Sequence, residues 1–184
     1  MTVIGIVGLP GSGKSEAAAV ARELDIPVVT MGDVVRQEAG DRGLDPASDH
    51  GAVAQALREE NGPAAIAERS LPIVEGHLED TAAVVIDGIR SGDEVARFEA
   101  AFGEDFTLVE ITAPRELRAE RLADRARDST AAEGGEALAD REERELGFGM
   151  QEAMDRADVT IENDASLDEY RAAIRELLQE AVEG

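Results

Sequence analysis

Cysteine is absent from this sequence, and lysine occurs only once. The absence of cysteine excludes a disulfide framework and any metal site built on thiolates. The first apolar run is too short to span a membrane and has no basic leader, so we expect neither a signal peptide nor a transmembrane helix. These features predict a cytoplasmic protein without a membrane partner. Lys14 is the single lysine among 18 basic residues, and the others are all arginine.

Negative charge dominates the chain, whose formal net charge is −23. Such a surface repels nucleic acid and anionic membranes, so we expect no nucleic-acid partner. An acidic, lysine-poor surface is typical of halophilic cytoplasmic proteins, because molar salt shortens the Debye length to about 3 Å and screens the self-repulsion. An acidic protein of ordinary salt tolerance is the alternative. Disorder is not expected, because apolar residues form 43% of the chain and recur periodically.

Short apolar segments alternate with helical patterns along the whole chain. The length of 184 residues fits one domain, residues 1–184. Strands are expected at 2–7, 26–30, 83–87, 106–112 and 158–163. Helices are expected at 14–24, 92–101, 114–126, 139–156 and 166–182. This alternation predicts an α/β fold with a five-stranded parallel sheet between helical layers.

Two stretches interrupt this alternation. The long segment between the second and third strands predicts three helices near 32–40, 48–60 and 63–75, with Pro63 at the first position of the last one. The second stretch, 128–140, is polar and contains glycine, which indicates a loop between two arginine-rich helices.

The segment GLPGSGKS follows the first strand and opens the first helix, and it matches the pattern G-x-x-x-x-G-K-S/T. Its glycines allow the backbone to curl so that successive N–H groups point at phosphate oxygens. Lys14 is expected to bind the β- and γ-phosphates of ATP as a compact charge, and the Ser15 hydroxyl is expected to bind Mg²⁺. The predicted nucleotide cradle comprises Gly8, Leu9, Pro10, Gly11, Ser12, Gly13, Lys14 and Ser15.

Asp87 ends the third predicted strand. A carboxylate at that edge of the sheet is a candidate ligand for Mg²⁺, directly or through water. The alternative is a turn aspartate preceding Gly88.

With these motifs, nearly the whole chain resembles the P-loop nucleotide kinases of the adenylate kinase and dephospho-CoA kinase type. It resembles in particular an archaeal family of dephospho-CoA-kinase-related P-loop proteins. The segments that carry the resemblance, besides GLPGSGKS, are MGDVVR, IDGIR, ELRAERLADRARD, DREERE and IENDASLDEY. The resemblance implies a P-loop three-layer sandwich, an acceptor-binding helical insertion at 31–78, a short lid at 126–140, and ATP·Mg²⁺ as the phosphoryl donor.

The resemblance also implies roles for individual residues. Arg36 and Arg90 would bind a phosphate of the acceptor, with Arg90 also catalytic. In the helix that leads to the lid, Arg121 would stack on the nucleotide and Arg125 would contact the transferring phosphate. Arg141 and Arg144, on the far side of the lid, are candidate phosphate ligands, and Asn163 would lie near the adenine.

Several charged residues have simpler interpretations. Asp33 is a candidate to orient or deprotonate an acceptor hydroxyl, and it is equally a candidate helix cap. Arg22, Arg97, Arg115 and Arg118 are interpreted as surface charges paired with nearby acids.

The sequence therefore predicts a kinase that transfers the γ-phosphoryl group of ATP to a small-molecule acceptor, either a nucleotide or a cofactor of the dephospho-CoA type. The alternative is a P-loop ATPase whose nucleotide state regulates a protein partner.

Overall fold

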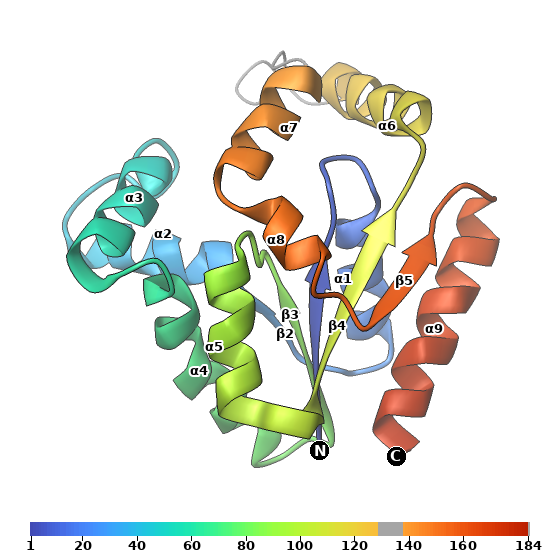
Figure 1. Ribbon diagram of the computed structural model, residues 1–184, viewed down its shortest axis with the longest axis horizontal. Helices are drawn as coiled ribbons and strands as arrows, with labels where there is room; N and C mark the ends of the chain where they lie inside the picture. The colour runs from blue at the N-terminus through green and yellow to red at the C-terminus, as the bar shows by residue number, and fades with distance from the viewer. Residues whose placement is uncertain (129–137, 184) are drawn as a thin grey trace.

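A computed structural model describes residues 1–128 and 138–183, except for the side chains of 125–128. Its centre is a five-stranded parallel sheet in the order β2-β3-β1-β4-β5 (Figure 1). The strands are β1 (Thr2–Val7), β2 (Val28–Thr30), β3 (Ala83–Asp87), β4 (Phe106–Thr112) and β5 (Val159–Glu162). A parallel sheet needs helices on both of its faces, and this chain supplies them. The predicted α/β fold class is therefore confirmed.

Helices cover the two faces of the sheet in separate layers (Figure 1). One layer contains α1 (Lys14–Glu23) and α9 (Leu167–Glu183). The other contains α4 (Ala65–Leu78), α5 (Gly92–Phe102) and α8 (Met150–Met154). Beyond the sheet lie α2 (Met31–Asp41), α3 (His50–Asn61), α6 (Arg115–Asp128) and α7 (Leu138–Gly147), and a 3₁₀ turn, η1 (Gly103–Asp105), follows α5.

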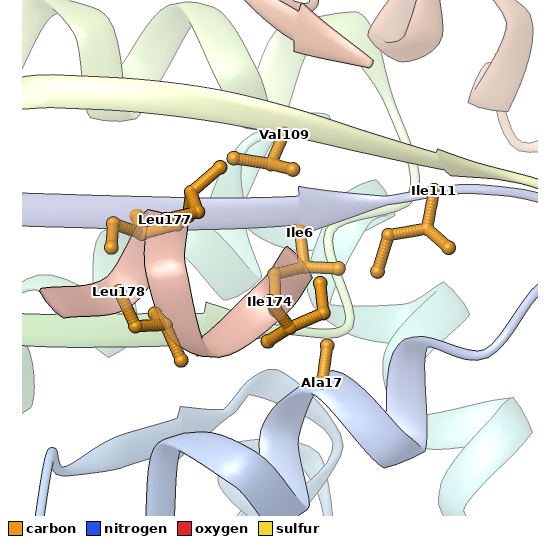
Figure 2. A pocket seen from close by; sticks show the side chains of 8 residues that line it. Ile6, Ala17, Val109, Ile111, Ile174, Leu177 and Leu178 are labelled. Atoms are coloured by element: carbon orange, nitrogen blue, oxygen red, sulfur yellow. The ribbon is translucent and has the colours of Figure 1, made fainter. Parts of the chain in front are cut away.

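Alternate residues of each central strand enter the two halves of the core. In β1, Val3 and Val7 pack toward α4 and α5, while Ile4 and Ile6 pack toward α1 and α9. The second half of the core contains a gap of about 10 Å³ with apolar walls (Figure 2). That volume is at the lower limit for a single water, and the walls offer no polar partner, so the gap is a packing defect and not a binding site.

The helices predicted between β2 and β3 are present as α2, α3 and α4. Helix α4 begins at Ala65, so the expectation that Pro63 starts it is wrong by two residues. Strand β2 begins at Val28 and not at residue 26.

The helix expected over 139–156 is two helices, and the expectation of one is therefore wrong. Helix α7 ends at Gly147, and α8 begins at Met150. Gly149 separates them with φ = 100°, a left-handed conformation that an α-helix cannot continue through. The resulting turn places Phe148 at the corner between the two helices.

Among the described residues, no helix combines the length and the apolar character that a membrane span requires.

Candidate functional site

The loop between β1 and α1 is shaped by three glycines with positive φ, namely Gly8, Gly11 and Gly13. The positions of Gly8 and Gly13 also exclude side chains on grounds of space. A Cβ at Gly8 would lie 2.3 Å from the Ile111 carbonyl oxygen, and one at Gly13 would lie 2.4 Å from Asn163 Nδ2. The glycines of GLPGSGKS are therefore required for two reasons: the backbone conformation favours glycine, and neighbouring atoms leave no space for a side chain.

Side chains from α6, from α9 and from the residue that follows β5 hold the outer carbonyls of this loop. Arg118 Nη1 donates to Pro10 O at 3.4 Å, and Arg121 Nη1 donates to Gly11 O at 3.3 Å. Asn163 Nδ2 donates to Ser12 O at 2.7 Å, and the Tyr170 hydroxyl donates to Gly13 O at 2.8 Å. Four successive carbonyls, at residues 10–13, are thus fixed from outside the loop.

Fixing a carbonyl also orients the next N–H group, because the two point in opposite directions across a planar trans peptide. The N–H groups of Gly11, Gly13 and Lys14 are thereby turned away from α6 and α9. Gly13 is the N-cap of α1 and provides no side-chain cap, so the first turn of that helix presents its backbone donors and its positive dipole end. The loop has the form of an anion cradle.

Lys14 lies over the cradle, and its Nζ donates to Gly8 O and, at 3.2 Å, to Leu9 O. Asp87 ends β3, where it pairs in register with Ile6 of the neighbouring β1, and it lies close enough to Lys14 for the two charges to interact. Burial raises the pKa of the Asp87 carboxyl, and the positive charge of Lys14 opposes that shift. No cluster of three or more His, Asp or Glu side chains with metal-binding geometry occurs among the described residues.

The cradle opens into a cleft of about 860 Å³. Helices α2, α3 and α4 form one side of the cleft, and α6 and α7 form another. Of the predicted site residues, the cleft brings together Pro10, Gly11, Gly13, Lys14, Ser15, Arg90, Arg141 and Arg144. The described residues that line the cleft include five cations and only three carboxylates, in a chain whose net charge is −23.

Arg36 and Asp33 lie outside this lining and bind each other. Arg36 Nε donates to Asp33 Oδ1 at 3.1 Å, and the two side chains are 48% and 69% exposed. The interpretation of Asp33 as a helix cap is wrong, because α2 begins at Met31 with Thr30 as its N-cap. Arg36 nevertheless lies near the cleft, since a Cβ on the lining residue Gly32 would be 3.5 Å from its guanidinium.

Arg121 and Asn163, expected near the nucleotide base, bind each other behind the loop, with Arg121 Nη2 donating to Asn163 Oδ1 at 3.2 Å. Arg118, interpreted from the sequence as a surface charge, is 6% exposed, and that interpretation is wrong. Its guanidinium also binds Glu142 of α7, so one side chain connects the cradle to the helix beyond the lid segment. Most of the predicted lid, 126–140, and the side chain of Arg125 lie outside the described residues.

Three further residues of the cleft were not anticipated from the sequence: Arg58, Glu94 and Phe148. Glu94 is fully buried, and it accepts hydrogen bonds from Arg58 Nη2 at 3.2 Å and from the Arg90 backbone N–H at 2.8 Å. Burial raises the pKa of the Glu94 carboxyl, and these two donors oppose the shift. The spacing Ser91-x-x-Glu94 was a detectable helix-start signal. The Arg90 guanidinium binds Glu145 of α7.

A family model described as an AAA domain matches residues 7–139. Similar curated proteins are archaeal. A UPF0200 protein of Halobacterium salinarum is 61% identical over 97% of this chain and 93% of its own length. One from Methanothrix thermoacetophila is 50% identical over 98% of both chains. A UPF0200/UPF0201 protein of Archaeoglobus fulgidus is 49% identical over 97% of this chain, which spans 55% of that longer protein.

Solved structures with the same fold are far more distant in sequence. TT1252 from Thermus thermophilus is 22% identical, with a TM-score of 0.63 over 97% of both chains. Shikimate kinase from Acinetobacter baumannii, in complex with shikimate, is 17% identical, with a TM-score of 0.56 over 100% of this chain and 94% of that one. At these identities the likeness concerns the fold alone, and the fold is that of the P-loop kinases.

Proposed function

Because this chain belongs to the UPF0200 family of archaeal proteins and contains an AAA domain with the P-loop kinase fold, we propose that it is an ATP-dependent kinase. The acceptor is a nucleotide or a nucleotide-like cofactor of the dephospho-CoA type. One observation carries the proposal: the phosphate cradle opens into a cleft that also contains Arg90, Arg141 and Arg144 and has a separate wall formed by α2, α3 and α4.

The volume of the cleft supports binding of two substrates. At about 860 Å³, it falls in the upper range of small-molecule sites, and the cradle contributes only a minority of its lining residues. The excess of cations in the lining, on a strongly acidic protein, favours ligands with several phosphate charges. Phosphoryl transfer depends mainly on positioning and on neutralising charge, which a cradle and converging arginines provide.

The residues present fit ATP and Mg²⁺. Ser12 Oγ is buried without a hydrogen-bond partner among the described residues, and Ser12 does not line the cleft, so a phosphate oxygen would satisfy it only after a shift of the loop. Ser15 and Asp87 would hold Mg²⁺, which needs few protein ligands because nucleotide phosphates and water complete its shell. The bound ion would neutralise charge on the phosphates.

In the proposed reaction, the cradle N–H groups and Lys14 hold the β- and γ-phosphates. Arg90, Arg141 and Arg144 orient the γ-phosphate and the acceptor, and Arg125 stabilises charge in the transition state. An acceptor oxygen forms the new bond to phosphorus while the bridging β–γ oxygen leaves with ADP. Asp33, after separating from Arg36, would orient an acceptor hydroxyl or take its proton. Closure of 126–140 as a lid would exclude water from the γ-phosphate.

The proposal is tested by measuring ADP formation in molar KCl with AMP, GMP, CMP, UMP or dephospho-CoA as the acceptor, and with no acceptor. We expect at least one acceptor to raise turnover strongly and to yield a phosphorylated product. Lys14→Ala should abolish that turnover with the circular dichroism unchanged, because alanine is a good helix former at the start of α1. Steady ADP formation that no acceptor changes would contradict the kinase proposal and favour an ATPase that regulates a protein partner.

A further inference from the structure

Phe148 is unusual among the aromatic residues of this chain, which has four phenylalanines and one tyrosine. Phe98, Phe106 and Tyr170 are buried, and Phe102 packs against the core. Phe148 is 41% exposed and is the single phenylalanine or tyrosine that lines the cleft among the described residues. Burying such a side chain stabilises a fold by roughly 1.5–3 kcal/mol, so a ring left at the wall of a binding cleft is available to a ligand.

The backbone holds this ring in a fixed place. Phe148 N donates to the carbonyls of Arg144 and Glu145 at 3.1 and 3.2 Å, which closes the last turn of α7. Gly149 N donates to Leu146 O at 3.0 Å, and its left-handed conformation then directs the chain into α8. The ring therefore projects from a hydrogen-bonded corner and not from a long irregular loop.

Arg58 of α3 supplies a second planar group beside the ring. Its Cζ lies 5.4 Å from the Phe148 ring centroid, within the range of a cation–π contact. The guanidinium is held there by Glu94, whose Oε1 is 3.2 Å from Arg58 Nη2. Because Glu94 is buried and also bound to the Arg90 backbone, Arg58 is anchored to the body of the protein.

Hydrogen-bonding groups lie on the same helix as Arg58. Gln55 and Glu59 both line the cleft, and Gln55 Nε2 donates to Glu59 Oε1 at 2.8 Å. This bond leaves oxygen acceptors of the amide and the carboxylate at the cleft wall. A flat aromatic group would stack on the Phe148 ring and the Arg58 guanidinium, and N–H donors at its edge would bind the acceptors of Gln55 and Glu59. Nucleobases have both features.

We propose that Phe148 and Arg58 form a stacking subsite for the nucleobase of the phosphoryl acceptor. This inference rests on the proposed kinase function and deepens it. Arg58 lies on α3 and Phe148 follows α7, whereas the cradle lies between β1 and α1 (Figure 1), so the subsite serves the acceptor and not ATP. Glu94 is a positioning residue for Arg58, and Gln55 and Glu59 accept hydrogen bonds from the edge of the base. The acceptor class is then a phosphorylated compound that contains a base, and not a sugar phosphate or an acyl chain alone.

The test compares ligands with and without a base. AMP and ribose 5-phosphate differ in the base alone, whereas dephospho-CoA differs from phosphopantetheine by a whole adenosine monophosphate unit. Calorimetry measures the Kd of AMP against ribose 5-phosphate, and of dephospho-CoA against phosphopantetheine, in molar KCl. The donor site is first saturated with Mg²⁺ and a non-hydrolysable ATP analogue, so that adenine binding there is not counted. We expect the base to strengthen binding by roughly 5- to 100-fold in at least one pair, the range for stacking on an aromatic side chain.

Variants assign that gain to the subsite. Phe148→Ala should remove the advantage of the base and leave the base-free ligands unaffected, while Phe148→Tyr should retain it. Leu146→Ala is the matched control, because Leu146 is similarly exposed on the same turn but does not line the cleft. Each variant should melt within a few degrees of the wild type.

Two results would overturn the subsite: equal affinity within both ligand pairs, or a base advantage that survives in Phe148→Ala. Absence of measurable binding for all four ligands would overturn it too. These outcomes are separate from failure of the kinase proposal, because acceptor binding is measured without turnover. If the base advantage depends on Phe148 but no acceptor is phosphorylated, the subsite stands and the kinase proposal fails.

Discussion

The hydroxyl of Tyr170 donates a 2.8 Å hydrogen bond to the carbonyl of Gly13, joining α9 to the N-cap residue of α1. Tyr170 is 2% exposed, and burial raises the pKa of its hydroxyl, so the group stays protonated and remains a donor. The two residues are 157 positions apart in the sequence. The last helix of the chain therefore contributes to the geometry of the first phosphate-binding turn.

Tyr170→Phe should weaken ATP binding more than it weakens the fold. Losing one neutral hydrogen bond costs about 0.5–1.5 kcal/mol, which corresponds to roughly a 2- to 10-fold rise in the Kd of ATP. The Kd of the acceptor should not change. Thr160→Val is the matched control, because it removes a hydroxyl that binds Glu110, away from the cradle. Calorimetry with a non-hydrolysable ATP analogue measures the effect, and an unchanged Kd in Tyr170→Phe would contradict the positioning role.

The sequence predicted the sheet, the cradle and the helices between β2 and β3 because these depend on local patterns. Apolar runs, helical periodicity and the glycine spacing are properties of neighbouring residues. The supports of the cradle are not local. Arg118 looked like a surface arginine because its partners, Pro10 O and Glu142, come from distant segments. Nothing in its own helix distinguishes it from Arg115, which is exposed.

The resemblance to archaeal P-loop kinases is confirmed for the family and the fold, whereas the roles of single residues stay predictions. Arg121 illustrates the difference. Its position in the arginine helix was foreseen, yet its guanidinium donates to Gly11 O and to Asn163. The direction of a long side chain depends on which acceptors the folded chain places around it, and a sequence pattern does not contain that information.

Salt should stabilise this protein strongly. Its net charge of −23 creates self-repulsion that screening reduces, as the Debye length falls from about 10 Å at 0.1 M to about 3 Å at 1 M salt. We expect the melting temperature, followed by circular dichroism, to rise steeply from low to molar KCl. Choline chloride at equal ionic strength is the control for a specific effect of potassium. A flat melting temperature across the series would refute the halophilic interpretation.

Arg36→Ala should raise the KM of the acceptor and leave that of ATP unchanged. In this role, Arg36 releases Asp33 and binds a phosphate of the acceptor at the edge of the cleft, where Gly32 lies. A charged hydrogen bond contributes about 1.5–3 kcal/mol, so the expected rise is roughly 10- to 100-fold. Arg42→Ala is the control, because Arg42 is paired with Glu38 and Glu60 at the far end of α2. Equal kinetic constants in the two variants would exclude Arg36 from acceptor binding.

The acid limb of the pH profile should depend on the concentration of Mg²⁺. Burial raises the pKa of Asp87 above its usual value, so its carboxylate gains a proton at a higher pH than an exposed aspartate would. The role proposed for Asp87 needs the ionised form, so activity should be present above this pKa and lost as the pH falls through it. Protons and Mg²⁺ then compete for one site.

Raising Mg²⁺ tenfold, at concentrations above its Kd, should therefore move the acid limb of kcat/KM to lower pH by about one unit. Glu94 also has a raised pKa and lines the cleft, but it is held by Arg58 and the Arg90 backbone and would titrate without regard to the metal. The response to Mg²⁺ consequently separates the two carboxyl groups. Asp87→Asn should lower kcat and abolish the metal-dependent movement of the limb. If the limb stays at one pH at every Mg²⁺ concentration in the wild type, Asp87 does not bind the metal.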